Sequence, residues 1–256
     1  MITVGVDVGS IFTKAVVLKD DEIAASLIRE TVGDISQKID GMIDEVLAAA
    51  GVSPEEVTAY VSSGQGEDLV ERADFSEDDI ACVAVATRHL LPDTELSIEI
   101  GGQSISTILS DPAGDILNYL RNDKCASGSG RFIEVIGTAL GVPIDDIDKV
   151  AGESHNKVAV STQCAVFAES EVISYVNRGE PVPDIIAGVC DAMARIIVSQ
   201  ALRVGPVENF TVAGGVACFS SVVDILKERI QGGYKPLPID PRLTVAYGAA
   251  LIGQEE

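Results

Sequence analysis

Apolar residues along the chain follow two different periods, and the period changes from one segment to the next. Short runs of mostly β-branched residues that end on Gly or Ser are typical of buried strands. They predict strands at residues 1–8, 13–18, 22–29, 57–61, 95–100, 104–109, 115–120 and 210–213. Apolar residues that recur every three or four positions predict helices at residues 35–50, 79–90, 130–140, 164–176, 183–204, 218–230 and 243–252. This mixture of strands and helices favours an α/β fold.

The same order of elements occurs twice along the chain. A strand meander followed by a helix begins near Met1, and a second one begins near Glu95. The repetition predicts two related lobes, the first formed by residues 1–94 together with 243–256 and the second by residues 95–242. At 256 residues the chain is long enough to give each lobe a core of its own.

Composition narrows the range of possible partners. The net charge of −22 argues against nucleic acid and against an acidic membrane surface. No apolar stretch is expected to reach the roughly 20 residues that span a membrane. Because Met1 leads directly into a strand pattern without a signal peptide, a cytoplasmic location is expected.

The cysteines fall into two groups. An odd number of cysteines in such a chain argues against a disulfide framework. Cys82, Cys190 and Cys218 lie among apolar neighbours and are predicted to be buried core thiols. Cys125 and Cys164 each lie just before a helical pattern, where the helix dipole would stabilise a thiolate. Two such junctions favour a metal or redox site over simple packing.

Three strands end in turns that are rich in small residues. The turns are Asp7–Ser10, Glu99–Ser104 and Ala213–Ala217. Glycine N–H groups and hydroxyls can hold phosphate oxygens, and a neighbouring carboxylate can hold Mg²⁺ through water. The candidate cofactor-binding residues are Gly9, Ser10, Thr13, Lys14, Gly101, Gly102, Ser104, Gly214, Gly215 and Val216. The candidate catalytic residues are Asp7, Glu99 and Gln103. A P-loop ATPase is disfavoured because the chain has no Gly-x-x-x-x-Gly-Lys-Ser/Thr sequence.

The order and spacing of these turns resemble the phosphate and adenosine motifs of the sugar kinase/heat-shock-70/actin ATPase superfamily. Within it, Asn122–Glu134, Gln163–Ser174 and Gly214–Ala217 are similar to one branch. That branch comprises the activators of 2-hydroxyacyl-CoA dehydratases and the ATPase subunits of benzoyl-CoA reductase. The resemblance covers essentially the whole chain. It implies two ribonuclease-H-like lobes, each with a mixed sheet flanked by helices, and ATP with Mg²⁺ in the cleft between them.

The cysteine pair has a stoichiometric consequence. A [4Fe-4S] cluster takes four thiolates, whereas Cys125 and Cys164 supply two per chain. Two copies related by a two-fold axis would supply four, provided that the metal site is real. Helices that start near these cysteines would turn free N–H groups toward the cluster and favour its reduced state.

The resemblance implies the same arrangement, with one cluster bridging a homodimer or a heterodimer with a homologous subunit. It also implies an anaerobic ATPase that passes low-potential electrons to an acyl-CoA dehydratase or reductase component, with a ferredoxin or flavodoxin as the electron source.

The chain departs from the pattern of that branch at several positions. Glu99 and Ser104 stand where its second phosphate motif has aspartates, and Val83 stands where a histidine is usual. These changes leave the hydrolysis rate and the identity of the partner open. The alternatives are a benzoyl-CoA-type reductase subunit, a small-molecule kinase and a nucleotide-binding regulator that does not hydrolyse. A kinase is disfavoured because no sugar-binding insertion lies between the motifs and because it would leave the cysteine pair unexplained.

Overall fold

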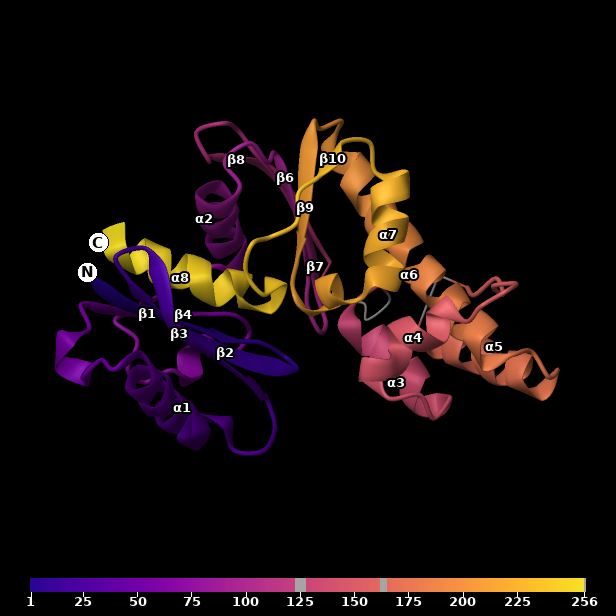
Figure 1. Ribbon diagram of the computed structural model, residues 1–256, viewed down its shortest axis with the longest axis horizontal. Coiled ribbons are helices and arrows are strands. Elements are labelled where there is room, and N and C mark those ends of the chain that lie inside the picture. Colours follow the sequence, from indigo (N-terminus) through magenta and orange to yellow (C-terminus); the bar gives the residue numbers. More distant parts are fainter. Residues whose placement is uncertain (123–127, 162–164, 256) are drawn as a thin grey trace.

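The computed structural model of the chain describes residues 1–122, 128–161 and 165–255, and it contains two mixed five-stranded sheets flanked by helices (Figure 1). The first sheet has the order β3-β2-β1-β4-β5, and the second has the order β10-β9-β6-β7-β8. In each sheet an antiparallel meander is extended by parallel strands. The predicted fold class is therefore confirmed.

The elements have the following bounds. The strands are β1 (Ile2–Val8), β2 (Phe12–Lys19), β3 (Glu22–Glu30), β4 (Ala59–Ser63), β5 (Phe75–Ser76), β6 (Leu96–Ile100), β7 (Ile105–Ser110), β8 (Ile116–Asn122), β9 (Asn209–Ala213) and β10 (Gly233–Tyr234). The helices are α1 (Ile35–Ala50), α2 (Asp79–Leu90), α3 (Gly130–Ala139), α4 (Ile147–Gly152), α5 (Ala165–Asn177), α6 (Val182–Val204), α7 (Ser220–Arg229) and α8 (Thr244–Glu255). Every predicted element is present, with ends that differ by a few residues, although residue 164 at the start of one predicted helix lies outside the described residues. β5, β10 and α4 were not predicted, because they are too short to show a period.

Alternate residues of the first sheet face two different helices. Ala15 and Val17 of β2 pack in one cluster with α1, whereas Val16 and Leu18 pack on the other side with α8. Because successive strand side chains point to opposite faces, a strand buried on both sides must be apolar throughout. This accounts for the continuous apolar run in β2.

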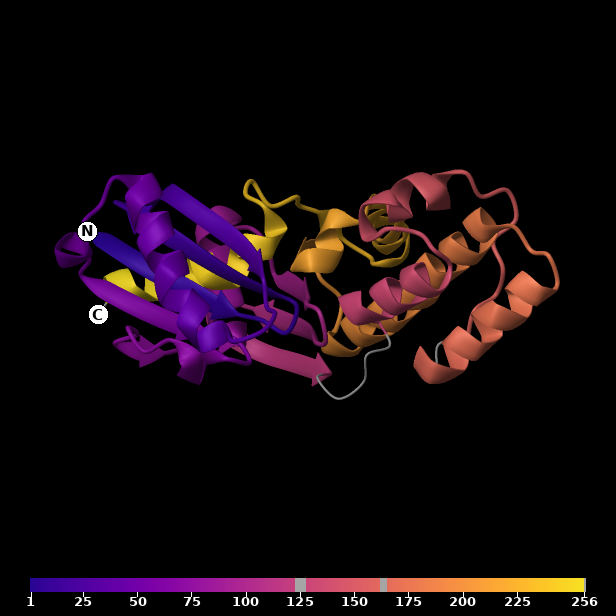
Figure 2. The same ribbon diagram turned by 90° about the horizontal axis from the view of Figure 1, so that it is seen from below.

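Helix α8 comes from the end of the chain and lies against β1, β4 and α2, between the two sheets (Figures 1 and 2). Its contacts are close because they meet glycines. A Cβ atom on Gly5 would lie 1.9 Å from the Ala246 carbonyl oxygen, and one on Gly248 would lie 1.9 Å from the Cys82 carbonyl oxygen. The division of the chain into lobes at residues 94/95 and 242/243 stays a prediction.

Replacing Gly248 by alanine is expected to lower the free energy of unfolding by roughly 2 to 4 kcal/mol, because backbone atoms of α2 occupy the space of the new methyl group. The matched control is Gly41→Ala. Gly41 is an exposed residue within α1 whose Cβ position has no atom within 4 Å, so alanine there should stabilise the helix by about 0.5 to 1 kcal/mol. Urea unfolding of both variants measures the difference, and equal effects would contradict the close packing of α8.

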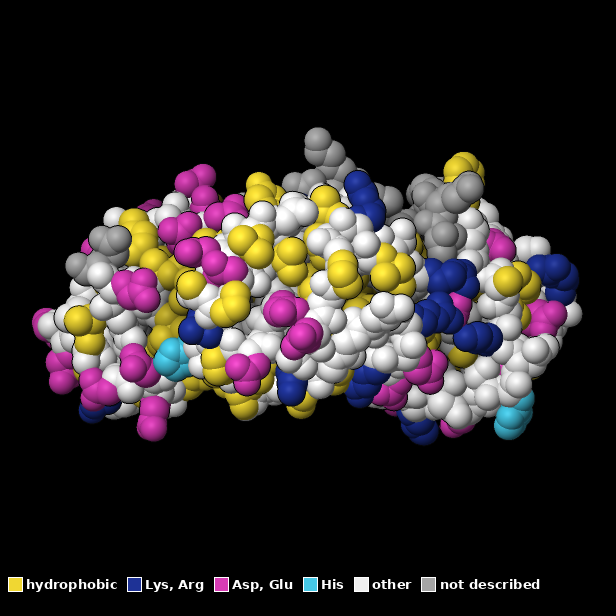
Figure 3. Space-filling model, turned by 90° about the horizontal axis from the view of Figure 1, so that it is seen from above, with side chains coloured by type: hydrophobic (Ala, Val, Ile, Leu, Met, Phe, Trp, Pro, Cys, Tyr) yellow, Lys and Arg dark blue, Asp and Glu magenta, His cyan; other side chains and the backbone are white. Residues whose placement is uncertain are grey.

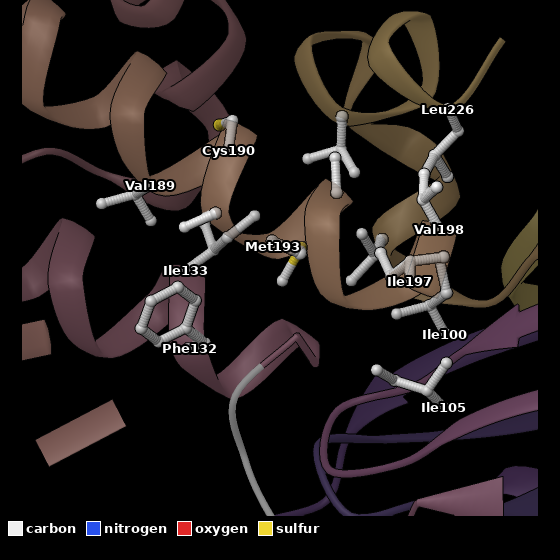
Figure 4. Close-up of a cluster of buried hydrophobic side chains, with 14 of the residues drawn as sticks. Ile100, Ile105, Phe132, Ile133, Val189, Cys190, Met193, Ile197, Val198 and Leu226 are labelled. Carbon is white, nitrogen blue, oxygen red and sulfur yellow. The ribbon is translucent and has the colours of Figure 1, made fainter. Parts of the chain in front are cut away.

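Helix α6 packs on the second sheet, and α3 packs against α6. Figure 4 shows Phe132 and Ile133 of α3 facing Val189 and Met193 of α6, and all four side chains belong to one buried cluster. In the same cluster Ile197 packs near the sheet residues Ile100 and Ile105. This core fixes α3 relative to the strand ends that carry the second turn.

Helix α6 has the length and apolarity of a membrane-spanning helix, with 23 residues and a mean hydropathy of 1.6 in its most apolar window. The expectation that no segment reaches this length was therefore wrong. However, 67% of that window is buried inside the protein, which is typical of a core helix. The surplus of apolar residues serves packing against the second sheet and α7.

Charge is distributed unevenly over the surface. On the face shown in Figure 3, basic side chains gather toward the end of the molecule that carries α5 and α6, whereas acidic ones predominate toward the chain termini. At the basic end the buried Asp191 accepts from Lys157 at 2.7 Å and from Arg229 at 2.6 Å, and it also pairs with Arg195. Burial raises the pKa of Asp191, but Lys157 and Arg229 outweigh that effect and keep it below its usual value.

Candidate functional site

A cavity of about 370 Å³ lies between the two sheets, within the size range of small-molecule sites. Most of the predicted site residues line it. They are Asp7, Gly9, Ser10, Lys14, Glu99, Gly101, Gly102, Ser104, Gly214, Gly215 and Val216. The three turns, which lie far apart in sequence, thus open into one space.

Two predicted residues do not line this cavity. Thr13 is buried, and its hydroxyl lies 3.0 Å from that of Thr31. Gln103 is half-buried in the second turn. Thr13 points away from the cavity because neighbouring strand residues alternate between faces, and Lys14 takes the side that faces the site.

The first turn holds an ion pair. Asp7 and Lys14 lie directly opposite each other on the antiparallel strands β1 and β2, and Lys14 Nζ donates to Asp7 Oδ2 at 2.7 Å. The side chains are only 7% and 15% exposed, so the pair is shielded from solvent. Gly64 stands against it with φ of +90°, and a Cβ there would lie 2.4 Å from Asp7 Oδ1. Glycine at position 64 is therefore needed for this position of the Asp7 carboxylate.

The second turn carries a buried carboxylate. Glu99 is 7% exposed, and burial raises its pKa to about 8, helped by the negative charges of Asp79 and Asp7 and opposed by Lys14. The third turn packs directly on it, because a Cβ on Gly214 would lie 2.6 Å from Glu99 Oε1. In the ligand-free protein at neutral pH, Glu99 is therefore largely protonated.

The N–H of the first glycine in each turn is already used in a backbone hydrogen bond within the protein. Gly9 donates to the Phe12 carbonyl at 3.1 Å, Gly101 to that of Ser104 at 3.0 Å, and Gly214 to that of Pro241 at 2.9 Å. These glycines shape the turns. Donation to a ligand then falls to the residues that follow them, such as Ser10 and Gly102.

The two phosphate-type turns touch each other and α3. A Cβ on Gly102 would lie 2.6 Å from Ser10 Oγ of the first turn. On its other side, the carbonyls of Gly101 and Gly102 each accept at 2.9 Å from the N–H groups of Gly130 and Arg131, the first residues of α3. The expectation that the N–H groups at this helix start are free to face a cluster is therefore wrong for these two, because the second turn uses them.

Several residues that line the cavity were not predicted as site residues from the sequence. Asp79 at the start of α2 lines the cavity and accepts hydrogen bonds from Arg121 NH1 and NH2, at 2.5 and 3.0 Å. In the sequence it was only an acidic residue in the first turn of a helix, which is common. The cavity is also lined by Ile144, Asp145, Asp148, Phe219, Pro241 and Arg242.

The three remaining cysteines differ in position. Cys82 and Cys190 are buried as predicted, and burial raises both pKa values, that of Cys190 to about 11. The prediction for Cys218 was wrong, since its side chain is exposed and lines the cavity. The reason is that α7 begins only at Ser220, so Cys218 belongs to the preceding turn rather than to the apolar side of the helix.

The residues present fit a divalent cation that arrives with a phosphate ligand. Among residues 1–122, 128–161 and 165–255, no group of three or more His, Cys, Asp or Glu side chains is arranged to hold a metal ion. Mg²⁺ usually needs only one or two carboxylates when phosphates and waters complete its shell, and Asp7 and Glu99 can supply these. A cation there would also favour the ionised form of Glu99. Cys125 and Cys164 lie outside the described residues.

Comparison with known proteins decides the family. Residues 4–253 match the BadF/BadG/BcrA/BcrD ATPase family. The chain belongs to this family. Among relatives, the (R)-2-hydroxyglutaryl-CoA dehydratase activating ATPase of Acidaminococcus fermentans is 36% identical over 97% of this chain and 95% of its own length. One of the benzoyl-CoA reductase subunits of Thauera aromatica is 29% identical over 90% of this chain and 83% of its own length.

A solved structure is also similar over the full chain. The 2-hydroxyisocaproyl-CoA dehydratase activator of Clostridioides difficile is 33% identical over 100% of this chain and 96% of its own length. Its structure with bound ADPNP superimposes with a TM-score of 0.93 and covers 100% of this chain and 95% of that one. The fold of this BadF/BadG/BcrA/BcrD family chain is thus that of an activating ATPase.

Proposed function

We propose that this chain binds ATP with Mg²⁺ in the cavity and hydrolyses it. The supporting observation is that three small-residue turns, a buried Asp7–Lys14 pair and Glu99 all open into one cavity of suitable size. The turns would hold the phosphates through backbone N–H groups, while Asp7 and Glu99 would hold the metal and its water. The metal would supply charge stabilisation at the transferring phosphoryl group.

In this proposal Glu99 changes protonation state as the site fills. Without a ligand, its pKa of about 8 keeps most of it neutral at pH 7. A neighbouring cation would lower that pKa, so the carboxylate would become available to hold or orient a water. Lys14 remains paired with Asp7 at 2.7 Å and keeps that carboxylate fixed.

The second part of the proposal is that hydrolysis drives delivery of a low-potential electron to a 2-hydroxyacyl-CoA dehydratase component. Its support is the named activity of the two dehydratase activators, which are 33% and 36% identical to this chain. A [4Fe-4S] cluster would be held by Cys125 and Cys164 of two subunits, in a homodimer or a heterodimer, and a cytoplasmic ferredoxin or flavodoxin would reduce it. The benzoyl-CoA reductase relative is less similar, so a dehydratase is the favoured partner.

Hydrogen bonds connect the second turn of the cavity to the start of α3. The second turn accepts directly from Gly130 and Arg131, and Cys125 lies only five positions before Gly130 in the sequence. A nucleotide that displaces Gly101 or Gly102 would therefore also displace the first turn of α3.

Protein purified without oxygen is expected to be brown and to contain about one four-iron cluster per dimer. Iron and acid-labile sulfide analysis measures this directly. Cys125→Ala and Cys164→Ala are each expected to be colourless and to retain ATP hydrolysis, because the proposed phosphate and metal contacts come from other residues, such as Asp7 and Glu99. Iron-free wild-type protein would remove the redox part of the proposal, and its ATPase activity would then be judged separately.

A further inference from the structure

An ion pair at the edge of the cavity joins α2 to β8. Arg121 NH1 and NH2 donate to Asp79 Oδ1 and Oδ2 at 2.5 and 3.0 Å, so both carboxylate oxygens are engaged. The two side chains are 23% and 15% exposed. Asp79 lines the cavity, and Arg121 is the residue before the last of β8. A planar guanidinium in this bidentate geometry fixes the carboxylate in orientation as well as in distance.

The charge of this pair extends to the proposed metal ligands. Asp79 raises the pKa of Glu99, and Arg121 lowers it. Burial raises the pKa of Asp79 itself, and Arg121 opposes that effect. The carboxylates of Asp7, Asp79 and Glu99 thus share the two cations Lys14 and Arg121. A divalent cation entering this region competes with the Arg121 guanidinium for the Asp79 carboxylate.

The end of β8 is held from two sides. On the side of α2 it is held by Arg121 through Asp79. On the side of α6, Gln200 Nε2 donates to the Leu120 carbonyl at 2.8 Å and to the Ile105 carbonyl at 3.1 Å, which ties β8 to its neighbour β7. If the first attachment weakens, β8 keeps its antiparallel pairing with β7 and its hydrogen bond from Gln200 of α6, but loses the ion pair that holds its end against α2. β8 ends at Asn122, and Cys125 follows three positions later in the sequence.

We propose that Arg121 is a positioning residue that releases Asp79 when a metal–nucleotide complex fills the cavity, and that this release loosens the end of β8. The inference rests on the proposed nucleotide binding. In the ligand-free protein Arg121 occupies the Asp79 carboxylate. In the filled protein the divalent cation takes over that charge, and residues 116–122 lose this bidentate ion pair with α2, although Arg121 NH1 also lies 4.0 Å from Asp78 Oδ2. The state of the cavity is thereby transmitted to the strand that leads toward Cys125.

The test is amide hydrogen exchange of residues 116–122, measured with Mg²⁺ and ADPNP, with ADPNP and EDTA, and without ligand. Binding of each ligand to the same samples is followed by calorimetry. In the wild type, Mg²⁺ with ADPNP should speed exchange in this segment about threefold or more, whereas ligand binding ordinarily slows exchange. With ADPNP and EDTA the exchange of this segment should stay slow, because it is the divalent cation that competes with Arg121 for Asp79.

In Arg121→Met, the amides of residues 116–122 should exchange rapidly in all three conditions. Its dissociation constant for Mg²⁺–ADPNP should stay within about tenfold of the wild-type value. Arg121→Lys keeps the charge but not the bidentate geometry, so it should give intermediate exchange. The control is Arg88→Met, an exposed arginine of α2 that donates to the Pro92 carbonyl at 2.9 Å, which should behave as the wild type.

The proposal is overturned if Arg121→Met and Arg121→Lys keep the wild-type response, or if wild-type residues 116–122 do not respond while calorimetry shows the ligand bound. Absence of ADPNP binding to the wild type would instead remove the proposed function, and this inference with it.

Discussion

Replacing Glu99 by glutamine is expected to stabilise the nucleotide-free protein at neutral and alkaline pH and to slow ATP hydrolysis strongly. The folded protein holds a proton on Glu99 up to a pKa of about 8, whereas the ordinary value is 4.5. Between these values the folded state binds more protons than the unfolded state, so the contribution of Glu99 to the free energy of unfolding falls as pH rises through this window. Glutamine is uncharged at every pH, so the variant does not lose this stability. The difference in free energy of unfolding between the two proteins amounts to roughly 2 to 5 kcal/mol at pH 9.

Urea unfolding of the wild type and of Glu99→Gln at pH 5 and pH 9 isolates this effect from that of the other carboxylates. The two proteins should be nearly equally stable at pH 5 and should separate by pH 9. Hydrolysis should fall by about 10² to 10³-fold, because a carboxylate beside the metal is lost. Glu99→Asp keeps the charge and should retain measurable turnover. Parallel pH profiles of wild type and Glu99→Gln would mean that Glu99 does not carry the raised pKa.

Replacing Asp7 by alanine is expected to reduce ATP hydrolysis by about 10³-fold or more and to leave the iron content unchanged. Asp7 lines the cavity and lies among the proposed metal ligands, whereas the proposed cluster ligands are Cys125 and Cys164. The change also leaves the Lys14 ammonium, which is 15% exposed, without its 2.7 Å partner. That unpaired charge should cost about 1 to 3 kcal/mol of stability.

A double variant separates the two consequences of losing Asp7. Asp7→Ala with Lys14→Met removes the unpaired charge, so most of the lost stability should return. Hydrolysis should stay absent, because the carboxylate is still missing. Wild-type hydrolysis by Asp7→Ala would exclude a metal role for Asp7, and unchanged stability would mean that the Asp7–Lys14 pair is not shielded as described.

Local patterns were sufficient for most of the fold. The continuous apolar run of β2 and the helical period of α6 each reflect burial that the residues themselves impose. The three turns could also be predicted. One small-residue turn after a strand is common, but three of them in this order are specific for phosphate binding. That they share one cavity followed from the family resemblance, because single turns do not specify their distance.

Features that depend on contacts far apart in sequence could not be predicted in this way. Asp79 has its place in the cavity because α2 is wedged between the two sheets, and its partner Arg121 comes from β8. Apolar neighbours in the sequence predict a core position for Cys218, whereas its exposure depends on where α7 begins. The N–H groups of Gly130 and Arg131 were expected to face a cluster, but the second turn accepts them.

The position of α8 has a consequence for how the chain is made. The face of the first sheet that carries Val16 and Leu18 is covered by residues 243–251, which follow all strands of both sheets in the sequence. The strands of the second sheet and helix α6 all emerge from the ribosome earlier. The middle of the chain can therefore complete its core while the N-terminal sheet still exposes one apolar face, a stage at which aggregation is a hazard. We therefore expect the first sheet to complete its core only after α8 has been synthesised.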